Sequence, residues 1–332
     1  MNTLIVLVLA DALSNGDSRI ALGMRLAAVV LCLNGVGQLG VELALANGHI
    51  TLFNLSRLGY TVLPSLIILG LGASGTLTTV TAYCATLAGQ VATVVVGVVI
   101  TLVLGTKGSA APTPWRDSLH LWSASAVDSV AGQLGQLVLA ALSTASQVGI
   151  YSIAVMLGAV AGGLAQALTQ VSYSRFLAQA RSEVVTSAKS LVRLTIIGVA
   201  STLIVGVLLI AFVKLFGTVL FGPTFDGLAL VTAAAMFSQI LSDQWNLRVM
   251  FDTANRQVSQ LIIASAAGAV TTGVLTVILV LTESLAAPTM ALALAGGAAS
   301  KIGARALISR KLRSGPHAVS GGSRSRDLGE QD

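Results

Sequence analysis

The sequence predicts an all-α, polytopic membrane protein of about ten transmembrane helices in two lobes. Apolar residues make up 55% of the 332 residues, whereas charged residues make up only 10%. The mean hydropathy is +0.87, and so apolar a chain cannot cover a soluble surface. Because no water reaches a peptide group in lipid, long apolar runs without period-two alternation favour helices over a β-barrel.

Ten apolar segments follow one another along the chain, and most reach the ~20 residues that a helix needs to cross ~30 Å of hydrocarbon. They span residues 1–12, 20–46, 55–72, 77–105, 120–142, 147–172, 189–216, 226–244, 257–281 and 284–307. The first segment ends at Asp11 and makes only ~18 Å of helix. It lacks the basic flank and cleavage site of a signal peptide, so a truncated start and a poorly inserted helix are both open interpretations.

The basic residues predict the orientation of these segments. Sixteen of the nineteen Lys and Arg residues occur in every second gap or at its edges. They are Arg57; Lys107 and Arg116; Arg175, Arg181, Lys189 and Arg193; Arg248 and Arg256; and the series from Lys301 to Arg326. The positive-inside rule places these gaps, and with them both termini, in the cytoplasm.

A stretch rich in Pro, Gly and charge divides the predicted helices into groups of four and six. We therefore expect a partial N-terminal transmembrane lobe over 1–105, a cytoplasmic inter-lobe linker over 106–118 and a C-terminal six-helix lobe over 119–308. Residues 309–332 have mixed charges and no apolar periodicity. They are typical of a disordered cytoplasmic tail.

Several function classes are disfavoured by the sequence. The pI near 9.7 would suggest nucleic acid in a soluble protein, but orientation explains basic residues beside apolar spans, so we expect no nucleic-acid partner. Cys32 and Cys84 lie in apolar segments, where small buried side chains are a better interpretation than a disulfide or a thiolate metal site. The three histidines are far apart in sequence, and no G-x-x-x-x-G-K loop is present. We expect no catalytic residues, no metal and no cofactor.

Two glycine motifs are interpreted as helix-packing signals. Gly35-x-Gly37-x-x-Gly40 matches a dinucleotide-binding fingerprint, but no strand precedes it and it lies in an apolar segment. Gly158-x-x-x-Gly162 has the spacing that lets two membrane helices approach closely.

Polar residues inside the apolar segments recur at spacings of four or eight, which predicts polar helix faces. The sets are Asn34, Gln38 and Glu42; Asp128 and Gln136; Gln166 and Gln170; and Gln239 and Asp243. Because a carboxylate facing lipid costs several kcal/mol, these faces should line a cavity or contact other helices. A substrate-binding vestibule is one interpretation. The other is contact between helices, with Glu42 and Asp243 about one turn from the predicted inner ends.

Three cations lie closest to the hydrocarbon, namely Arg25, Arg57 and Lys214. Arginine suits bidentate phosphate contact, so Arg25 and Arg57 are candidate substrate-binding residues for a phosphate-bearing lipid. Lys214 reaching the outer interface and Arg57 acting as an inside anchor are the alternatives.

Three short motifs resemble the polysaccharide-biosynthesis flippases, the O-antigen-type lipid-linked oligosaccharide exporters of the multidrug/oligosaccharidyl-lipid/polysaccharide exporter superfamily. Val148-Gly149-Ile150-Tyr151-Ser152-Ile153-Ala154 is similar to an element early in that family's second lobe. Leu220-Phe221-Gly222-Pro223-Thr224-Phe225-Asp226 is similar to its Phe-Gly-x-x-Phe turn, and Ala46-Asn47-Gly48 with Asn54-Leu55-Ser56-Arg57 is similar to a first-lobe loop.

The resemblance implies a flippase that moves a polyprenyl-diphosphate-linked oligosaccharide to the outer leaflet by alternating access. It implies a bacterial-type inner membrane, contact with membrane lipids and, as partners, a glycan polymerase or glycosyltransferases. The coupling ion, H⁺ or Na⁺, stays open. The chain departs from the family in beginning near the third helix of the first lobe, and in having Gln136 where many members carry Asp.

Two other functions are compatible with the sequence. An ion-coupled multidrug or organic-cation antiporter would use Glu42, Asp128 or Asp243 to bind protons or Na⁺, and a cavity rich in carboxylates and poor in cations would favour it. A non-transporting membrane scaffold of a glycan-assembly complex is the third function considered, because the first lobe is expected to be incomplete.

Overall fold

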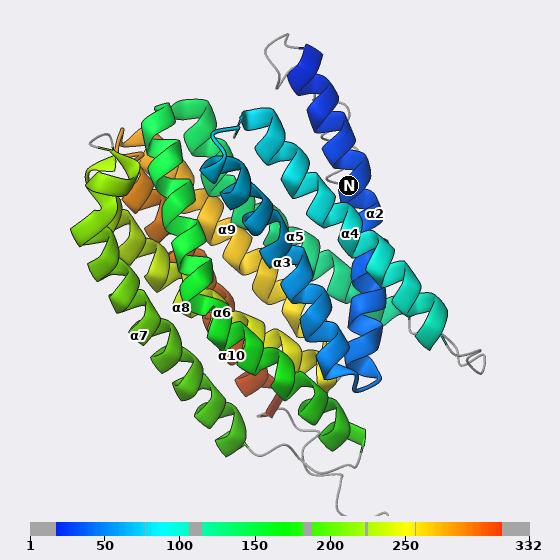
Figure 1. Cartoon of the computed structure of the whole chain (residues 1–332). Helices are drawn as coiled ribbons and strands as arrows, with labels where there is room; N and C mark the ends of the chain where they lie inside the picture. The colour runs from blue at the N-terminus through cyan, green and yellow to red at the C-terminus, as the bar shows by residue number, and fades with distance from the viewer. Residues whose placement is uncertain are drawn as a thin grey trace, which may run out of the picture. The chain divides into compact units, whose positions relative to one another are not determined.

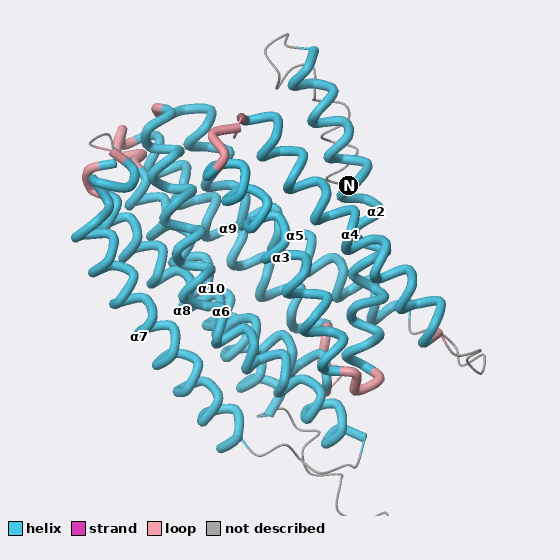
Figure 2. Tube along the Cα trace, viewed as in Figure 1, coloured by secondary structure: helices cyan, strands magenta, loops and turns pink. Residues whose placement is uncertain are grey.

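The computed structural model describes residues 18–76, 78–105, 115–181, 188–222, 225–255 and 257–313. These residues form nine α-helices, labelled α2 to α10, and contain no strand (Figures 1 and 2). The predicted all-α class is confirmed. The predicted segment 1–12, residues 106–114 of the predicted linker and residues 314–332 of the predicted tail lie outside the described residues.

The chain divides into two compact units, residues 1–112 and 113–332, with the boundary inside the stretch 106–118. The described helices of the first unit are α2 (Ser18–Ala46), α3 (Ile50–Ala73) and α4 (Thr79–Leu104). Those of the second unit are α5 (Trp115–Leu142), α6 (Ala145–Arg181), α7 (Ala188–Phe221), α8 (Leu228–Ala254), α9 (Ser259–Leu281) and α10 (Ala287–Arg313).

Seven of the described helices are long and apolar enough to cross a membrane: α2, α4, α5, α6, α7, α9 and α10. Their outer faces carry large apolar side chains in contact with the surroundings, such as Leu102 on α4 (77% exposed) and Leu208 on α7 (65% exposed). Such faces are stable against lipid but not against water. The second unit and part of the first therefore have the surface of a multi-pass membrane protein.

In the first unit, α2 and α4 pack through glycines. A Cβ added at Gly40 would collide with the carbonyl of Gly97, and one added at Gly97 would collide with the carbonyl of Gly37. Only glycine permits so close an approach of two helix backbones. The interpretation as a packing signal is confirmed for Gly37 and Gly40, whereas a Cβ at Gly35 would meet no atom within 4 Å.

In the second unit, α8 packs against α6, α7 and α10 (Figure 1). Leu139, Tyr151, Leu228 and Met290, from α5, α6, α8 and α10, belong to one buried apolar cluster, in which none is more than 3% exposed. On α6, Gly158 faces the Ala235 carbonyl of α8, so the second glycine motif also lies at a helix contact. Asp243, Gln244 and Asp252 of α8 are buried and therefore lie between helices rather than facing lipid.

Several sequence expectations were wrong. The helix predicted over 226–244 continues to Ala254, so Asp243 lies well inside α8 and not near its end. The helices predicted to end at 172 and at 307 continue to Arg181 and to Arg313. Residues 115–118 of the predicted linker belong to α5. These errors arise because hydropathy marks the apolar part of a helix, whereas its hydrogen-bond ladder continues through polar residues. Cys32 and Cys84 are exposed rather than buried, because the apolar helix faces on which they lie are outer faces.

Candidate functional site

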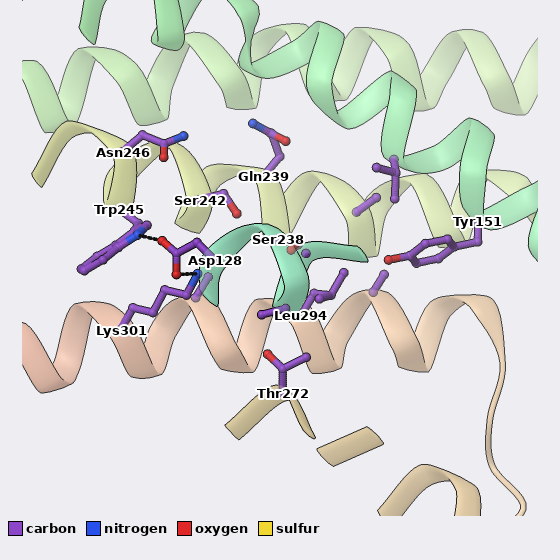
Figure 3. Close-up of a pocket in the computed structure, with 16 residues that line it drawn as sticks. Asp128, Tyr151, Ser238, Gln239, Ser242, Trp245, Asn246, Thr272, Leu294 and Lys301 are labelled. Atoms are coloured by element: carbon purple, nitrogen blue, oxygen red, sulfur yellow. Dashed lines mark hydrogen bonds and ion pairs between the residues drawn. The ribbon is translucent and has the colours of Figure 1, made fainter. Parts of the chain in front are cut away.

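The second unit contains a cavity of ≈ 280 Å³ between α5, α6, α8, α9 and α10 (Figure 3). Its wall combines charged and polar side chains with apolar ones. The polar lining is Asp128, Ser238, Gln239, Ser242, Asn246, Thr272 and Lys301. A cavity with a few polar groups set among apolar walls is the usual form of a small-molecule site.

An ion pair between α5 and α10 lies on the cavity wall. The Lys301 Nζ atom lies 2.8 Å from Asp128 Oδ1, and the two side chains are 14% and 24% exposed. The Trp245 indole on α8 donates a hydrogen bond of 2.7 Å to Asp128 Oδ2. Lys301 Nζ also lies 5.9 Å from the centre of the Trp245 ring, within the range of a cation–π contact. Asp128 thus lies between an ammonium and an indole N–H, as Figure 3 shows.

Small residues and packing hold Lys301 in this position. A Cβ at Gly268 on α9 would collide with the Lys301 side-chain stem, so the stem crosses α9 where there is no side chain. Trp245 is 3% exposed and packs in an apolar cluster with Leu261 and Ala264. Because both neighbours of Asp128 are fixed by packing, the carboxylate has a defined position in the wall.

Tyr151 of α6 lies at the opposite end of the cavity from Asp128 and Lys301 (Figure 3). Its hydroxyl lies against the backbone of Gly135 on α5, where a Cβ at residue 135 would be 2.4–3.3 Å from Tyr151 and Met290 atoms. The charged groups and the tyrosine therefore define two ends of one polar-lined space.

A second ion pair joins α8 and α10 outside this cavity lining. Arg305 Nε donates to Asp252 Oδ2 at 2.9 Å, and Nη2 donates to Oδ1 at 2.5 Å. Asp252 is 0% exposed and Arg305 is 16% exposed, so the carboxylate of this bidentate pair is fully buried.

The predicted site residues of the second unit fall into four environments, the fourth of which is the exposed position of Gln136. Asp128 and Gln239 line the cavity. Asp243 is 3% exposed and accepts hydrogen bonds from Gln239 and Thr202, and Gln166 also interacts with it. Gln170 is half-buried.

Gln136 has no place in the cavity lining. It is exposed, and its amide is 3.4 Å from the Ser152 hydroxyl. The predicted face of Asp128 and Gln136 is therefore not one site.

In the first unit, the predicted polar face of α2 is partly a helix contact. Asn34 donates to Gln90 of α4, as the alternative interpretation expected. Gln38 is half-buried, and Glu42 and Arg25 are exposed. Arg57 lies in α3, and its side chain is not among those that the structure describes.

Sequence reasoning missed Lys301 and Trp245. Lys301 was included among the inside anchors, although it lies six residues before the end of the predicted segment 284–307. Its spacing of four from Arg305 was a usable signal, because two cations on one face of an apolar helix require partners.

The described residues contain no cluster of three or more His, Cys, Asp or Glu side chains that could hold a metal ion.

Comparison with known proteins gives one informative finding. No protein-family profile and no curated protein sequence matches the chain. The chain is similar in fold to a crystal structure of MATE in the straight conformation, with a TM-score of 0.60 and 14% identity over 93% of this chain and 74% of that chain.

The fold of this chain is therefore a MATE-like polytopic helical fold. This similarity supports the sequence expectation at the level of the fold alone. The narrower assignment to the O-antigen-type flippases stays a prediction.

Proposed function

We propose that this protein is a membrane transporter that moves a phosphate-bearing, lipid-linked oligosaccharide across the membrane by alternating access. The observation that carries the proposal is the Lys301 ammonium on the wall of the cavity in the second unit, paired with Asp128. The MATE-like fold supports a membrane exporter. The Lys301 ammonium, rather than the net charge of the lining, supports an anionic substrate.

Lys301 supplies what a phosphate needs. An ammonium has three donors, and Asp128 Oδ1 binds it by charge rather than by an aligned hydrogen bond. A phosphate entering the cavity would compete with Asp128 for the ammonium, while Asp128 keeps its hydrogen bond from Trp245. The ion pair thus satisfies both charges when substrate is absent and offers a cation when it is present.

The remaining polar lining suits a sugar. Ser238, Ser242 and Asn246 follow one another on one side of α8 and line the cavity. Hydroxyl and amide groups exchange hydrogen bonds with sugar hydroxyls, so the desolvation of a glycan is compensated there. The cavity volume of ≈ 280 Å³ fits one or two sugar units of the head group, and the prenyl tail would stay in lipid.

In the first unit, Arg25 and Arg57 remain proposed as further residues that donate hydrogen bonds to the phosphate of the substrate. Such a substrate would be supplied or consumed by a glycan polymerase or glycosyltransferases at a bacterial-type inner membrane.

The antiporter is the second candidate, and Asp128 is the observation that favours it. A carboxylate on a cavity wall could bind an organic cation. Lys301 already occupies that carboxylate, so a cationic drug would have to displace an ammonium held by three neighbouring helices. The two functions predict opposite effects of removing Lys301. Loss of the ammonium weakens binding of an anion and frees Asp128 for a cation.

The test is transport by the purified chain in liposomes. One cargo is a fluorescent polyprenyl-diphosphate oligosaccharide and the other is a fluorescent organic cation. We expect transfer of the oligosaccharide, reduced at least tenfold by Lys301→Gln and unchanged by Lys214→Gln, since Lys214 is exposed on α7. Cation transfer that increases in Lys301→Gln would establish the antiporter instead. Folded protein that moves neither cargo would favour the scaffold.

A further inference from the structure

Three charged side chains lie together toward the C-terminal ends of α8 and α10, outside the lining of the large cavity. Arg305 binds Asp252 through two hydrogen bonds. Arg248, one turn before Asp252 on α8, interacts electrostatically with both of these residues. We call the three residues the α8–α10 charge cluster. Because two guanidinium groups share one carboxylate, the cluster has one positive charge in excess.

Helical spacing places Arg248 between α7 and α10, which both pack against α8. Gln244, Arg248 and Asp252 are four residues apart and therefore follow one another along one strip of α8. At one end of the strip the Gln244 amide is 3.4 Å from the Thr195 carbonyl of α7. At the other end Asp252 binds Arg305 of α10. The Arg248 side chain, between these contacts, is only half-buried, so it can be reached from outside the helix bundle.

The cluster lies at the level where the apolar part of the helices ends. Leu247, next to Arg248 on α8, packs in one cluster with Leu191 and Leu194 of α7. The apolar span of α7 begins at Ser190, about one helical turn from these leucines. At this level a cationic side chain meets the lipid head groups rather than the middle of the hydrocarbon.

The described residues supply no second carboxylate to this cluster. Asp128 pairs with Lys301 on the cavity wall, and Asp243 accepts hydrogen bonds from neutral side chains. Arg248 itself makes one described hydrogen bond, from Nη1 to the Gln244 carbonyl at 2.9 Å. That bond uses one of the five N–H donors of a guanidinium group. The excess charge and the remaining donors therefore suit an anion from outside the described part of the chain.

Arg305 also keeps donors for a second anion. Its bonds to Asp252 use Nε and one hydrogen of Nη2, which leaves the other Nη2 hydrogen and both hydrogens of Nη1. The Arg305 side chain is 16% exposed, so these donors are not sealed inside the bundle. Two guanidinium groups with spare donors are well matched to a phosphate, which accepts several charge-assisted hydrogen bonds at once.

We propose that Arg248 and Arg305 bind the phosphate of an anionic phospholipid, in the leaflet at the C-terminal end of α8. The basic residues predict that this is the cytoplasmic leaflet. A lipid suits the site better than a free phosphate, because its acyl chains would cover the apolar face of α7 that exposes Val192 and Ile196. The lipid site lies outside the cavity and does not rest on the proposed function.

The test is lipid binding to the purified full-length chain, measured by native mass spectrometry with phosphatidylglycerol and phosphatidylcholine as probes. We expect tighter binding of phosphatidylglycerol, which has the anionic head group. Arg248→Gln should weaken that binding about tenfold, the size expected for the loss of one charge-assisted contact. Arg248→Lys keeps the charge without the planar fork, so its loss should be smaller. Arg193→Gln, the matched control at an exposed position of α7, should bind as the wild type does.

The same lipid should raise the temperature of thermal unfolding of the wild type and of Arg193→Gln, and raise it less in Arg248→Gln. If Arg248→Gln does not fold, Arg248→Lys and Arg193→Lys take the place of the two glutamine variants.

Four results would overturn the proposal. The first is equal binding of the two lipids by the wild type. The second is equal weakening by the Arg248 and Arg193 variants, which would show general attraction to a basic surface. The third is displacement of phosphatidylglycerol by an equal concentration of inorganic phosphate, which would assign the site to a soluble phosphate compound. The fourth is a loss of binding in Lys301→Gln as large as in Arg248→Gln, which would place the lipid in the cavity.

Discussion

Two ion pairs lie one helical turn apart on α10, and their surroundings differ. Arg305 binds Asp252 through two hydrogen bonds, and Asp252 is 0% exposed. Lys301 binds Asp128 through one contact of 2.8 Å at the edge of a cavity, and Asp128 is 24% exposed. The comparison separates a fully buried carboxylate, held by two hydrogen bonds, from a partly exposed carboxylate that lines a cavity.

Arg305→Ala should be the most destabilising change, because it leaves the Asp252 carboxylate buried and unpaired. Breaking a buried pair from one side costs about 3–5 kcal/mol. Thermal unfolding of the purified protein in detergent measures the loss. Arg193→Ala is the control, since Arg193 is exposed on α7, and its effect should stay within about 0.5 kcal/mol. If Arg305→Ala and Arg193→Ala lost similar amounts of stability, Arg305 would stabilise the protein no more than an exposed cation does.

Gly268→Ala should be the second most destabilising change. We expect the free energy of unfolding to fall by about 1–3 kcal/mol, because the added methyl group overpacks against the Lys301 stem. The control is Gly273→Ala on the same helix, where a Cβ meets no atom within 4 Å. That variant should gain about 0.5–1 kcal/mol from helix propensity. The same unfolding measurement applies, and a Gly268→Ala variant as stable as Gly273→Ala would contradict the described position of Lys301.

Trp245→Phe should cost about 1.5 kcal/mol, because it removes the indole N–H that donates to Asp128 and keeps the aromatic packing. Trp122→Phe, at an exposed position of α5, should have almost no effect. If a double variant with Asp128→Ala, which has no side-chain acceptor, shows the two losses to be additive, the hydrogen bond does not stabilise the protein.

The smallest effect on stability should come from removing both charges of the cavity pair. We expect the double variant Asp128→Asn, Lys301→Gln to lie within about 1 kcal/mol of the wild type, and each single variant to be less stable than the double. Oligosaccharide transfer should nevertheless fall at least tenfold in the double variant. Stability and transport together therefore distinguish this pair from Asp252–Arg305.

The helices could be predicted from the sequence because lipid requires long apolar runs, and the described helices follow those runs from α2 to α10. The helix α8 was predicted too short for the same reason. Its polar residues Asp243, Gln244 and Asp252 are buried against other helices, and hydropathy cannot distinguish that burial from a polar loop.

The site was predicted only in part. Helical spacing correctly grouped Gln239 with Asp243, because both lie on the same helix. It could not place Lys301 beside Asp128, since that contact joins residues 173 positions apart on different helices. A cation near a helix end has the same one-dimensional pattern whether it anchors the helix or lines a cavity. Only the packing of α9 through Gly268 decides which role Lys301 has.

The hydrogen bond from Trp245 to Asp128 has a kinetic consequence. An anion that takes Lys301 from Asp128 leaves the carboxylate where the indole holds it, still close to the incoming negative charge. Under the proposed function, this repulsion would shorten the residence time of the cargo, and a carrier must release its cargo in order to turn over. We then expect Asp128→Asn to bind the anion more tightly and to deliver it more slowly.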